Sequence, residues 1–502
     1  MDLARHKLII HLCIILFVLL TALSDNGETA VAQSQLRWAS QDRIPFYDDL
    51  ILEPPQLIAD SSGVVHAFNA QVTDSGAAIM YRHWTVDKGW TIPTDVIIPP
   101  NNEIQARNIP LDVSLDENGM VHLVFMAGNL RESNIYYSRA PLVDANNARA
   151  WSTPLIIGTH ALLNPPQVTM IGDHKGDLFV AFSGSRDGSG LYMVQSNDGG
   201  NRWSEVQSIF LTYTWDFWPS ALTMHIDSQE NVHALWAVAG LDGLSDAVFY
   251  SRLEKGQTEW SEPFEMARVI GFQADTPAII EYDKELFVTY HNDFPTTSWM
   301  RRSSDGGNTW TEPVRFAPGF VGSNGAIDFV IDSSNTLHAF WGNRTGSPII
   351  HGMWHRVWLG DRWGDIEAVV SGPQVVDDIG GNGFDPKFAR AVISRGNILL
   401  ITWTTDGFAG ENGAWYSYTI LDAPQLPAEP VPAPIETPTP TAVPVTIDQT
   451  PTPNPYLAIG GNSEGGAVEV SPSTPLVAGI APVLLLLGLI IVIYRLFFIT
   501  RS

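Results

Sequence analysis

The sequence contains almost no cysteine. The single residue, Cys13, lies in an apolar N-terminal segment, so the rest of the chain cannot form an intramolecular disulfide. Hydrophobic residues make up 45% of the sequence and aromatic residues 10%. Stability must therefore come from a packed core, and this composition is sufficient to build one.

Basic residues are also scarce. Lys and Arg number 28 against 54 Asp and Glu, which gives a formal net charge of −26. This balance excludes a nucleic-acid ligand, because binding to phosphates needs a basic face. No cofactor is expected and no metal-binding residues are assigned, because the Asp-, Gly- and Asn-rich loops lack the spacing of an EF-hand calcium loop; their carboxylate and carbonyl oxygens leave bound calcium as an open alternative.

The N-terminus has the three parts of a secretory signal, and residues 1–32 are interpreted as a signal peptide. Arg5 and Lys7 precede an apolar stretch over residues 8–20, and Ala30-Val31-Ala32 offers a cleavage point. The alternative is an uncleaved N-terminal anchor.

The C-terminal part of the chain predicts a stalk and a membrane anchor. Residues 424–475 begin with 11 prolines in 32 residues, which favours an extended, semi-rigid stalk. Residues 476–494 carry no charge and are long enough to cross a bilayer as a transmembrane helix. Arg495 and Arg501 follow, so residues 495–502 are expected in the cytoplasm and the rest outside the cell, anchored in the membrane.

A repeat of roughly 50–60 residues fills the region between these ends, residues 33–423. Its first marker is a tryptophan, found at Trp38, Trp90, Trp151, Trp203, Trp260, Trp310 and Trp363, with gaps of 52, 61, 52, 57, 50 and 53 residues. Its second marker is a turn residue followed by an inner strand, often opening on histidine, as in His66, His122, His233 and His338. We expect these histidines to lie in the core, because they share one repeat position.

Each unit reads as four short strands without a helical stripe, which predicts an all-β propeller of four-stranded antiparallel blades. In the fourth unit the strands are expected at 221–227, 232–238, 247–252 and 260–267. The last unit has only three strands, whereas residues 36–40 around Trp38 resemble an isolated outer strand. The N-terminal strand is therefore predicted to complete the last blade, which favours seven blades, with six as the alternative.

Two turns carry nearly complete Asp boxes of the form S-x-D-x-G-x-x-W. Their defining residues are Ser196, Asp198, Gly200 and Trp203 in one and Ser303, Asp305, Gly307 and Trp310 in the other. The carboxylate can accept backbone N–H bonds, the glycine supplies a positive φ, and the tryptophan packs into the blade. The repeat resembles the sialidase (Asp-box) superfamily of propellers, in which the box is a structural turn away from the active site.

The resemblance implies where catalytic residues would lie if the chain were a sialidase. Such an enzyme clamps its substrate carboxylate with arginines and uses a tyrosine nucleophile. Arg107, Arg131 and Arg344 are the candidate arginines and Tyr416 is the candidate nucleophile. The pattern is partial, because Arg43-Ile44-Pro45 has the family's letters but lies on the expected outer strand, and no Asp follows Arg131 as acid/base.

Propeller topology places the inter-blade connections and the loops between second and third strands on one face, called the connection face below. Aromatic, acidic and arginine residues in these loops suit sugar rings, whose C–H faces stack on aromatic rings and whose hydroxyls need polar partners. The candidate ligand-binding residues are Trp215, Asp216, Trp218, Arg186, Asp275 and Asp385. The alternative is that they are ordinary solvated loop residues.

These features predict a membrane-anchored, cell-surface propeller that binds extracellular glycan, a glycoconjugate or another polymeric ligand. The first alternative is an exo-acting sialidase-type glycoside hydrolase, and the second is a protein-binding scaffold. The sequence leaves the oligomeric state and the ligand's identity open.

Overall fold

The computed structural model describes residues 36–48, 53–73, 76–100, 109–129, 133–162, 167–212, 216–269, 273–293, 295–322, 325–345, 350–373, 385–405 and 413–432. The chain divides into two compact units, Met1–Thr439 and Pro440–Ser502, and all described residues belong to the first. In these ranges no helix is both long and apolar enough for a membrane span. The predicted signal peptide, most of the stalk and the segment 476–494 lie outside them, so these assignments stay predictions.

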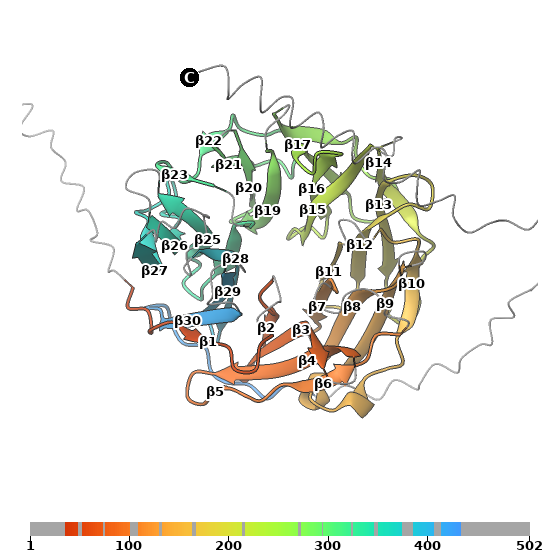
Figure 1. The fold of residues 1–502 in the computed structure, drawn as a ribbon, viewed down its shortest axis with the longest axis horizontal. Coiled ribbons are helices and arrows are strands. Elements are labelled where there is room, and N and C mark those ends of the chain that lie inside the picture. Colours follow the sequence, from red (N-terminus) through yellow and green to blue (C-terminus); the bar gives the residue numbers. More distant parts are fainter. Residues whose placement is uncertain are drawn as a thin grey trace, which may run out of the picture. The chain divides into compact units, whose positions relative to one another are not determined.

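The described residues form a ring of seven antiparallel sheets (Figure 1). The innermost strand of each sheet contacts the innermost strands of its two neighbours, in the closed order β2, β7, β11, β15, β19, β24, β28 and back to β2. Within each sheet most strands pair with the strand next to them in the chain, because connections are short. The predicted seven-bladed propeller is therefore confirmed.

The first four blades each run from the axis outward. Blade 1 contains β2 (Gln56–Ala59), β3 (Val65–Thr73), β4 (Gly76–Thr85), β5 (Gly89–Trp90) and β6 (Thr94–Ile97). Blade 2 contains β7 (Leu111–Leu115), β8 (Met120–Gly128), β9 (Ser133–Pro141) and β10 (Leu155–Thr159), with the short 3-10 helices η2 (Leu142–Asp144) and η3 (Ala148–Ala150) before β10. Blade 3 contains β11 (Val168–Gly172), β12 (Leu178–Gly184), β13 (Gly190–Ser196) and β14 (Gln207–Leu211). Blade 4 contains β15 (Phe217–Ile226), β16 (Val232–Gly240), β17 (Ser245–Leu253) and β18 (Phe264–Arg268), close to the expected ranges.

The remaining blades follow the same plan. Blade 5 contains β19 (Asp275–Tyr282), β20 (Glu285–Asn292), β21 (Thr297–Ser303) and β22 (Val314–Arg315). Blade 6 contains the short β23 (Phe320–Val321) and β24 (Asp328–Ile331), both paired with β25 (Leu337–Thr345), then β26 (Ile350–Val357) and β27 (Glu367–Pro373). Blade 7 contains β28 (Pro386–Ser394), β29 (Ile398–Thr405), β30 (Ala414–Ile420) and β1 (Asp42–Arg43).

The N-terminal segment closes the ring, as predicted. β1 pairs with β30 as the outer strand of blade 7, although it forms at Asp42–Arg43 rather than at residues 36–40. The earlier residues still follow β30, because Ala39 N donates to Tyr418 O at 2.8 Å and Ser417 Oγ donates to Ala39 O at 2.7 Å. The N-terminal segment thus covers the edge of β30 and links the start of the propeller to its last blade.

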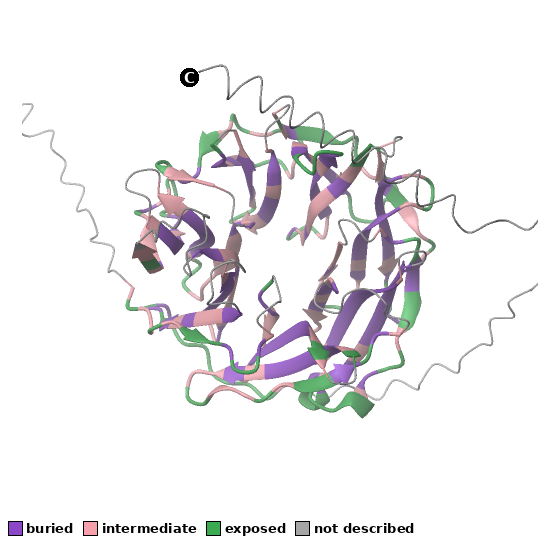
Figure 2. Cartoon of the chain, viewed as in Figure 1, coloured by how far each residue is buried: buried purple, intermediate pink, exposed green. Residues whose placement is uncertain are grey.

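Apolar packing between blades forms the core. Buried residues concentrate on the middle strands of each blade, while exposed residues lie on the outer strands and turns (Figure 2). Several indole and phenyl rings are fully buried there, including Trp84, Trp236, Trp341 and Trp403. This burial replaces the disulfides that the sequence cannot form.

The Asp-box turns have the geometry that the sequence predicts. Asp198 Oδ1 accepts the Arg202 N–H at 2.8 Å and the Ser196 hydroxyl at 3.0 Å. In the second box, hydrogen bonds from the Thr309 side chain and N–H hold the pKa of Asp305 at about 2. Both turns lie opposite the connection face, on what we call the Asp-box face.

Each Asp box is also gripped by the preceding blade. Arg252 in blade 4 donates to Gly306 O at 2.8 Å and to Asn308 Oδ1 at 2.7 Å in the box of blade 5. The Tyr250 ring packs against Trp310 with centroids 4.9 Å apart. Blades 2 and 3 repeat this arrangement through Arg139, Tyr137 and Trp203. The tryptophans thus pack across the interface with the preceding blade, and we call the contact the blade clamp.

A buried relay supports the clamp. His233 lies between the Asp227 carboxylate (3.1 Å) and the Tyr250 hydroxyl (2.8 Å), and its exposed fraction is 0%. Burial alone would raise the pKa of Asp227, but hydrogen bonds from His233 and Asn231 outweigh it and hold that pKa far below its ordinary value. Equivalent relays begin at His66 and His122, so the expected core position of the repeat histidines is confirmed.

The clamp predicts unequal effects of alanine at the two glycines of one Asp box. Gly306 and Gly307 both have positive φ, at 68° and 85°, but a Cβ at Gly307 would overlap the Tyr250 hydroxyl, whereas a Cβ at Gly306 meets nothing within 4 Å. We expect Gly306→Ala to lower the free energy of unfolding by about 1–2 kcal/mol. Gly307→Ala should cost about 1–3 kcal/mol more, because of overpacking. Denaturant titration of both variants tests this, and equal losses would contradict the clamp.

Candidate functional site

The connection face collects the ends of strands from all blades, and several predicted site residues lie outside the described part of its loops. Arg107, Arg131 and Trp215 are among those residues. Asp216, Trp218, Arg186, Asp275, Asp385 and Arg344 are described. The site is therefore built from these residues and their neighbours.

Two aromatic residues, Phe217 and Trp218, lie at the start of blade 4, and we call this pair the aromatic ledge. β15 begins at Phe217, whose side chain is 42% exposed, followed by the half-buried Trp218. Phe217 lies opposite Gly240, and a Cβ at Gly240 would come within 3.4 Å of its ring. Asp216 and Asp242 provide exposed carboxylates beside this ledge. An exposed ring flanked by carboxylates can stack on an apolar face and accept hydroxyl hydrogen bonds.

Asp275 begins the innermost strand of blade 5 and faces His291 at the end of β20. The Asp275 Oδ1 to His291 Nδ1 distance is 3.9 Å, and both residues are buried. Gln273 donates to Asp275, and the hydroxyl of Thr276 contacts His291. Burial lowers the pKa of His291, so the imidazole is neutral at physiological pH.

Arg344, Asp385 and His351 form an ionic cluster between blades 6 and 7. Asp385 Oδ1 lies 2.8 Å from His351 Nδ1, and Asp385 Oδ2 lies 3.8 Å from the Arg344 guanidinium. Asp385 is buried while Arg344 stays partly exposed. The two predicted residues are thus brought together, with Asp385 balancing the charge that Arg344 would offer to an anionic ligand.

Arg390 carries positive charge on the axial wall. It lies on β28, and its charge opposes the burial that raises the pKa of Asp112 and of Asp328. Both carboxylates also bridge blades: Asp112 accepts the Met170 N–H at 2.9 Å, and Asp328 accepts the Ala391 N–H at 2.5 Å. These acids therefore tie innermost strands together.

Three residues with a left-handed φ lie where innermost strands leave the connection face. In β15, β19 and β28 the pairing register shifts, and Ala221, Thr276 and Phe388 there have φ of 48°, 45° and 52°. A left-handed φ in a residue with a side chain is costly and persists only where the surroundings impose it. The bulges re-aim the residues that precede them, among them Trp218, Asp275 and Asp385.

Two predicted residues lie away from the axis. Arg186 is exposed on the rim, where it donates to Val206 O at 3.5 Å and lines a shallow hollow with His160. Tyr416 lies on β30, the third strand of blade 7, with its ring 5.8 Å from that of Trp90 in blade 1. In the parts of the chain that the structure describes, Arg186, Arg344 and Tyr416 do not converge. The catalytic assignment of Tyr416, Arg344, Arg107 and Arg131 remains a hypothesis.

Arg43 lies on an outer strand, as its position shortly after Trp38 predicted. It belongs to β1 on the outside of blade 7, and its guanidinium lies 5.8 Å from the centre of the Trp415 ring. The following Pro45 O accepts a hydrogen bond from the buried Arg82 of blade 1 at 2.6 Å. The Arg-Ile-Pro segment therefore joins blades 7 and 1.

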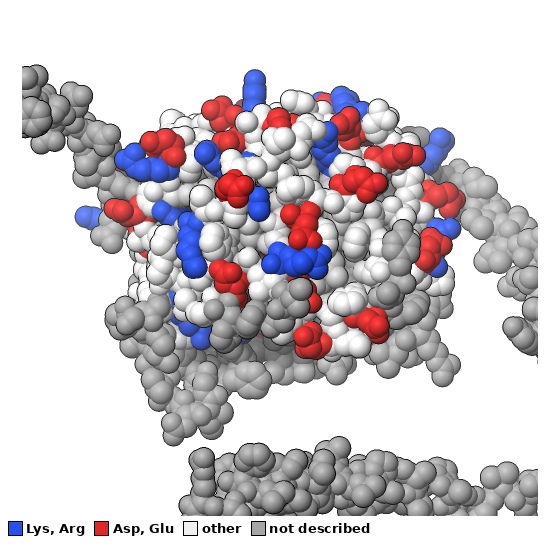
Figure 3. Space-filling model, turned by 90° about the horizontal axis from the view of Figure 1, so that it is seen from above, with Lys and Arg blue, Asp and Glu red and all other residues white. Residues whose placement is uncertain are grey.

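Five residues of this face were not predicted from the sequence: His291, His351, Arg390, Asp112 and Asp328. A polar residue within an otherwise apolar innermost strand, as in Leu111-Asp112-Val113, is the one signal that could have indicated an axial side chain. The histidine contacts depend on strand pairing and carry no local signal. Charge offers no further guide, since acidic and basic residues are interspersed on the side of the propeller seen in Figure 3.

Comparisons with known proteins support the fold. No protein-family model matches the sequence, and no curated protein is similar to it. The solved structures that resemble the chain include a polysaccharide lyase of family PL25, an ulvan lyase (TM-score 0.51, 11% identity, 76% of this chain and 96% of the lyase). They also include an intramolecular trans-sialidase from Ruminococcus gnavus (TM-score 0.41, 14% identity, 77% and 98% covered). With its Asp-box turns and seven blades, the chain is a sialidase-like propeller in fold.

Arg390 gives a prediction with a defined pH dependence. The folded-state pKa values of Asp112 and Asp328 are raised by burial and partly lowered by Arg390. Arg390→Ala should therefore lower the free energy of unfolding at pH values where Asp112 and Asp328 are ionised, because the ionised carboxylates lose a nearby positive charge. Protonation of Asp112 and Asp328 removes their negative charge, so the difference in the free energy of unfolding between variant and native chain should shrink as the pH falls below the two pKa values. Thermal unfolding against pH tests this, with the exposed Arg362→Ala as control; a loss that grows on acidification would contradict it.

Proposed function

We propose that the chain is a cell-surface, sialidase-like propeller that binds extracellular glycan or another polymeric ligand through its connection face. The aromatic ledge of blade 4 carries this proposal. Phe217 and Trp218 present ring surface beside Asp216 and Asp242 on a strained innermost strand. Exposed aromatic rings with nearby carboxylates are suited to sugars, whose C–H faces stack and whose hydroxyls donate.

The similarity to the polysaccharide lyase favours a polymeric ligand. One lyase structure is described as bound to -[GlcA(1-4)Rha3S]-. Its 11% identity to this chain supports the shared fold only, so the ligand class is an extension to this protein. An open ring face built from several blades can accommodate more than one sugar unit.

The rest of the topology completes the proposal. A signal peptide at residues 1–32 would export the propeller, residues 424–475 would act as stalk, and a helix at 476–494 would anchor it in the membrane. This arrangement would hold the connection face clear of the bilayer.

Glycan-array binding by the full-length chain tests the proposal. We expect Phe217→Ala and Trp218→Ala each to weaken binding about tenfold, because each removes stacking area worth about 1 kcal/mol or more. Phe264→Ala is a matched control, because Phe264 is also 42% exposed but lies on the outer strand β18. Binding to no glycan at all would refute the proposal and favour the protein-binding scaffold.

The hydrolase alternative is tested with a fluorogenic sialoside. We expect no turnover, because Arg186 lies on the rim, Asp385 balances Arg344, and Tyr416 packs at a blade junction. The comparison variant is Arg107→Ala, which removes the arginine that best fits the family's register. Turnover by the native chain that this substitution abolishes would overturn a purely binding role.

A further inference from the structure

The blade clamp is missing between blades 3 and 4. Blade 3 has Phe179 where blade 2 has His122, since each lies six residues after the turn aspartates Asp173 and Asp116. In strand register, Gln195 lies opposite Phe179 as Arg139 lies opposite His122. Blade 3 therefore lacks the arginine that would grip the next blade.

The turn of blade 4 has changed in step with this loss. By the same register, blade 3 has Met193 at the position of Tyr137, and blade 4 has Gln257 at the position of Gly307. A side chain at Gly307 would overlap a tyrosine hydroxyl, so Gln257 is possible only because Met193 replaces that tyrosine. The two substitutions are physically coupled.

Blade 5 has the same Phe–Met pair, yet its junction is filled. There Phe287 is fully buried, and Trp358 of blade 6 packs on it with ring centroids 5.1 Å apart. Trp358 of blade 6 and Leu253 of blade 4 occupy equivalent positions. Each directly follows the residue that pairs with the repeat histidine of its blade, namely Val357 opposite His338 and Arg252 opposite His233. Blade 4 thus has the smaller Leu253 at this position, and a cavity of about 320 Å³ remains between blades 3 and 4.

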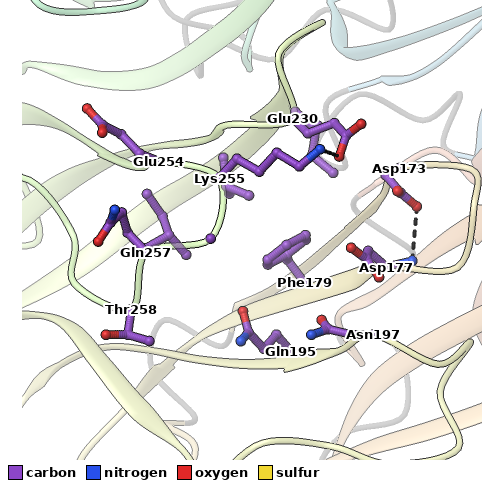
Figure 4. Close-up of a pocket in the computed structure, with 14 residues that line it drawn as sticks. Asp173, Asp177, Phe179, Gln195, Asn197, Glu230, Glu254, Lys255, Gln257 and Thr258 are labelled. Carbon is purple, nitrogen blue, oxygen red and sulfur yellow. Dashed lines mark hydrogen bonds and ion pairs between the residues drawn. The ribbon is translucent and has the colours of Figure 1, made fainter.

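The cavity combines an aromatic surface with polar groups (Figure 4). The half-buried Phe179 ring lies among Gln195, Asn197 and Thr258, while Lys255 extends across to Glu230 at 2.5 Å. Its volume is at the lower end of small-ligand sites. A ligand here would find a ring to stack on and amide and hydroxyl groups to hydrogen-bond.

The uncompensated charge in the cavity is negative. Glu230 is paired with Lys175 and Lys255, and Glu254 is paired with Arg252. Among the described residues, no side chain donates to the carboxylate of Asp177. Burial and the neighbouring Asp173 and Glu230 raise the pKa of Asp177, and the charges of Lys255 and Lys175 oppose this shift only in part.

We propose that this cavity on the Asp-box face binds a small polyhydroxylated amine, such as a protonated amino sugar. The ammonium pairs with Asp177 and faces the Phe179 ring, and the hydroxyls bond Gln195, Asn197 and Thr258. The site lies on the face opposite the aromatic ledge and does not depend on the proposed glycan function.

Isothermal titration calorimetry of the full-length chain with D-glucosamine and D-glucose tests the proposal, at a pH where the amine is protonated. We expect saturable binding of glucosamine and at least about tenfold weaker binding of glucose, which lacks the ammonium. Asp177→Asn should weaken glucosamine binding by about tenfold and leave glucose unaffected.

Leu253→Trp places a ring where blade 6 has Trp358 and should abolish binding by filling the cavity. Circular dichroism and thermal unfolding verify that this variant folds, and Asp177→Asn serves if it does not. Phe264→Ala, on the outer strand of blade 4, is the control that should bind normally. The proposal is overturned if glucosamine does not saturate, if glucose binds equally well, or if Asp177→Asn binds unchanged.

Discussion

The propeller depends on contacts that pass from one blade to the next on the Asp-box face. Arg252 and Tyr250 of one blade contact the backbone and the tryptophan of the following Asp box. The Asp227–His233 pair in turn hydrogen-bonds the hydroxyl of Tyr250 and fixes its position. An isolated four-stranded sheet cannot bury both faces, so stability requires such neighbour contacts. The carboxylate, imidazole and guanidinium groups involved are hydrogen-bonded, which is the condition for burying them at tolerable cost.

Fixing one face leaves the other free for function. The clamps, relays and Asp boxes lie on the Asp-box face, whereas the connection face carries the bulged strand starts and the aromatic ledge. The interface between blades 3 and 4 shows the reverse case. Loss of a tyrosine and an arginine from the clamp leaves a cavity on this face, whereas the junctions between blades 2 and 3, 4 and 5, and 5 and 6 are filled.

The repeat made the fold predictable. Seven tryptophans and a period near 50–60 residues indicated the number of blades, and the unpaired strand around Trp38 indicated the closure, because strand pairing follows chain order within each blade. The candidate site was less predictable. Arg186 and Arg344 both lie near the end of a second strand, yet Arg186 is exposed on the rim and Arg344, within β25, meets Asp385, because the adjacent blade supplies a carboxylate to only one of them.

The sequence by itself determined the all-β repeat, the local geometry of the Asp boxes and the core position of the repeat histidines, because each follows from spacing or from contacts within one turn. Only the tertiary structure decided that Tyr137 and Arg139 contact the Asp box of the next blade. It also decided that Arg390 lies close enough to Asp112 and Asp328 to influence the pKa of both, and that Phe179 borders a cavity. These outcomes join residues from different blades. Their physical basis is the close approach of side chains across an interface, which no single repeat encodes.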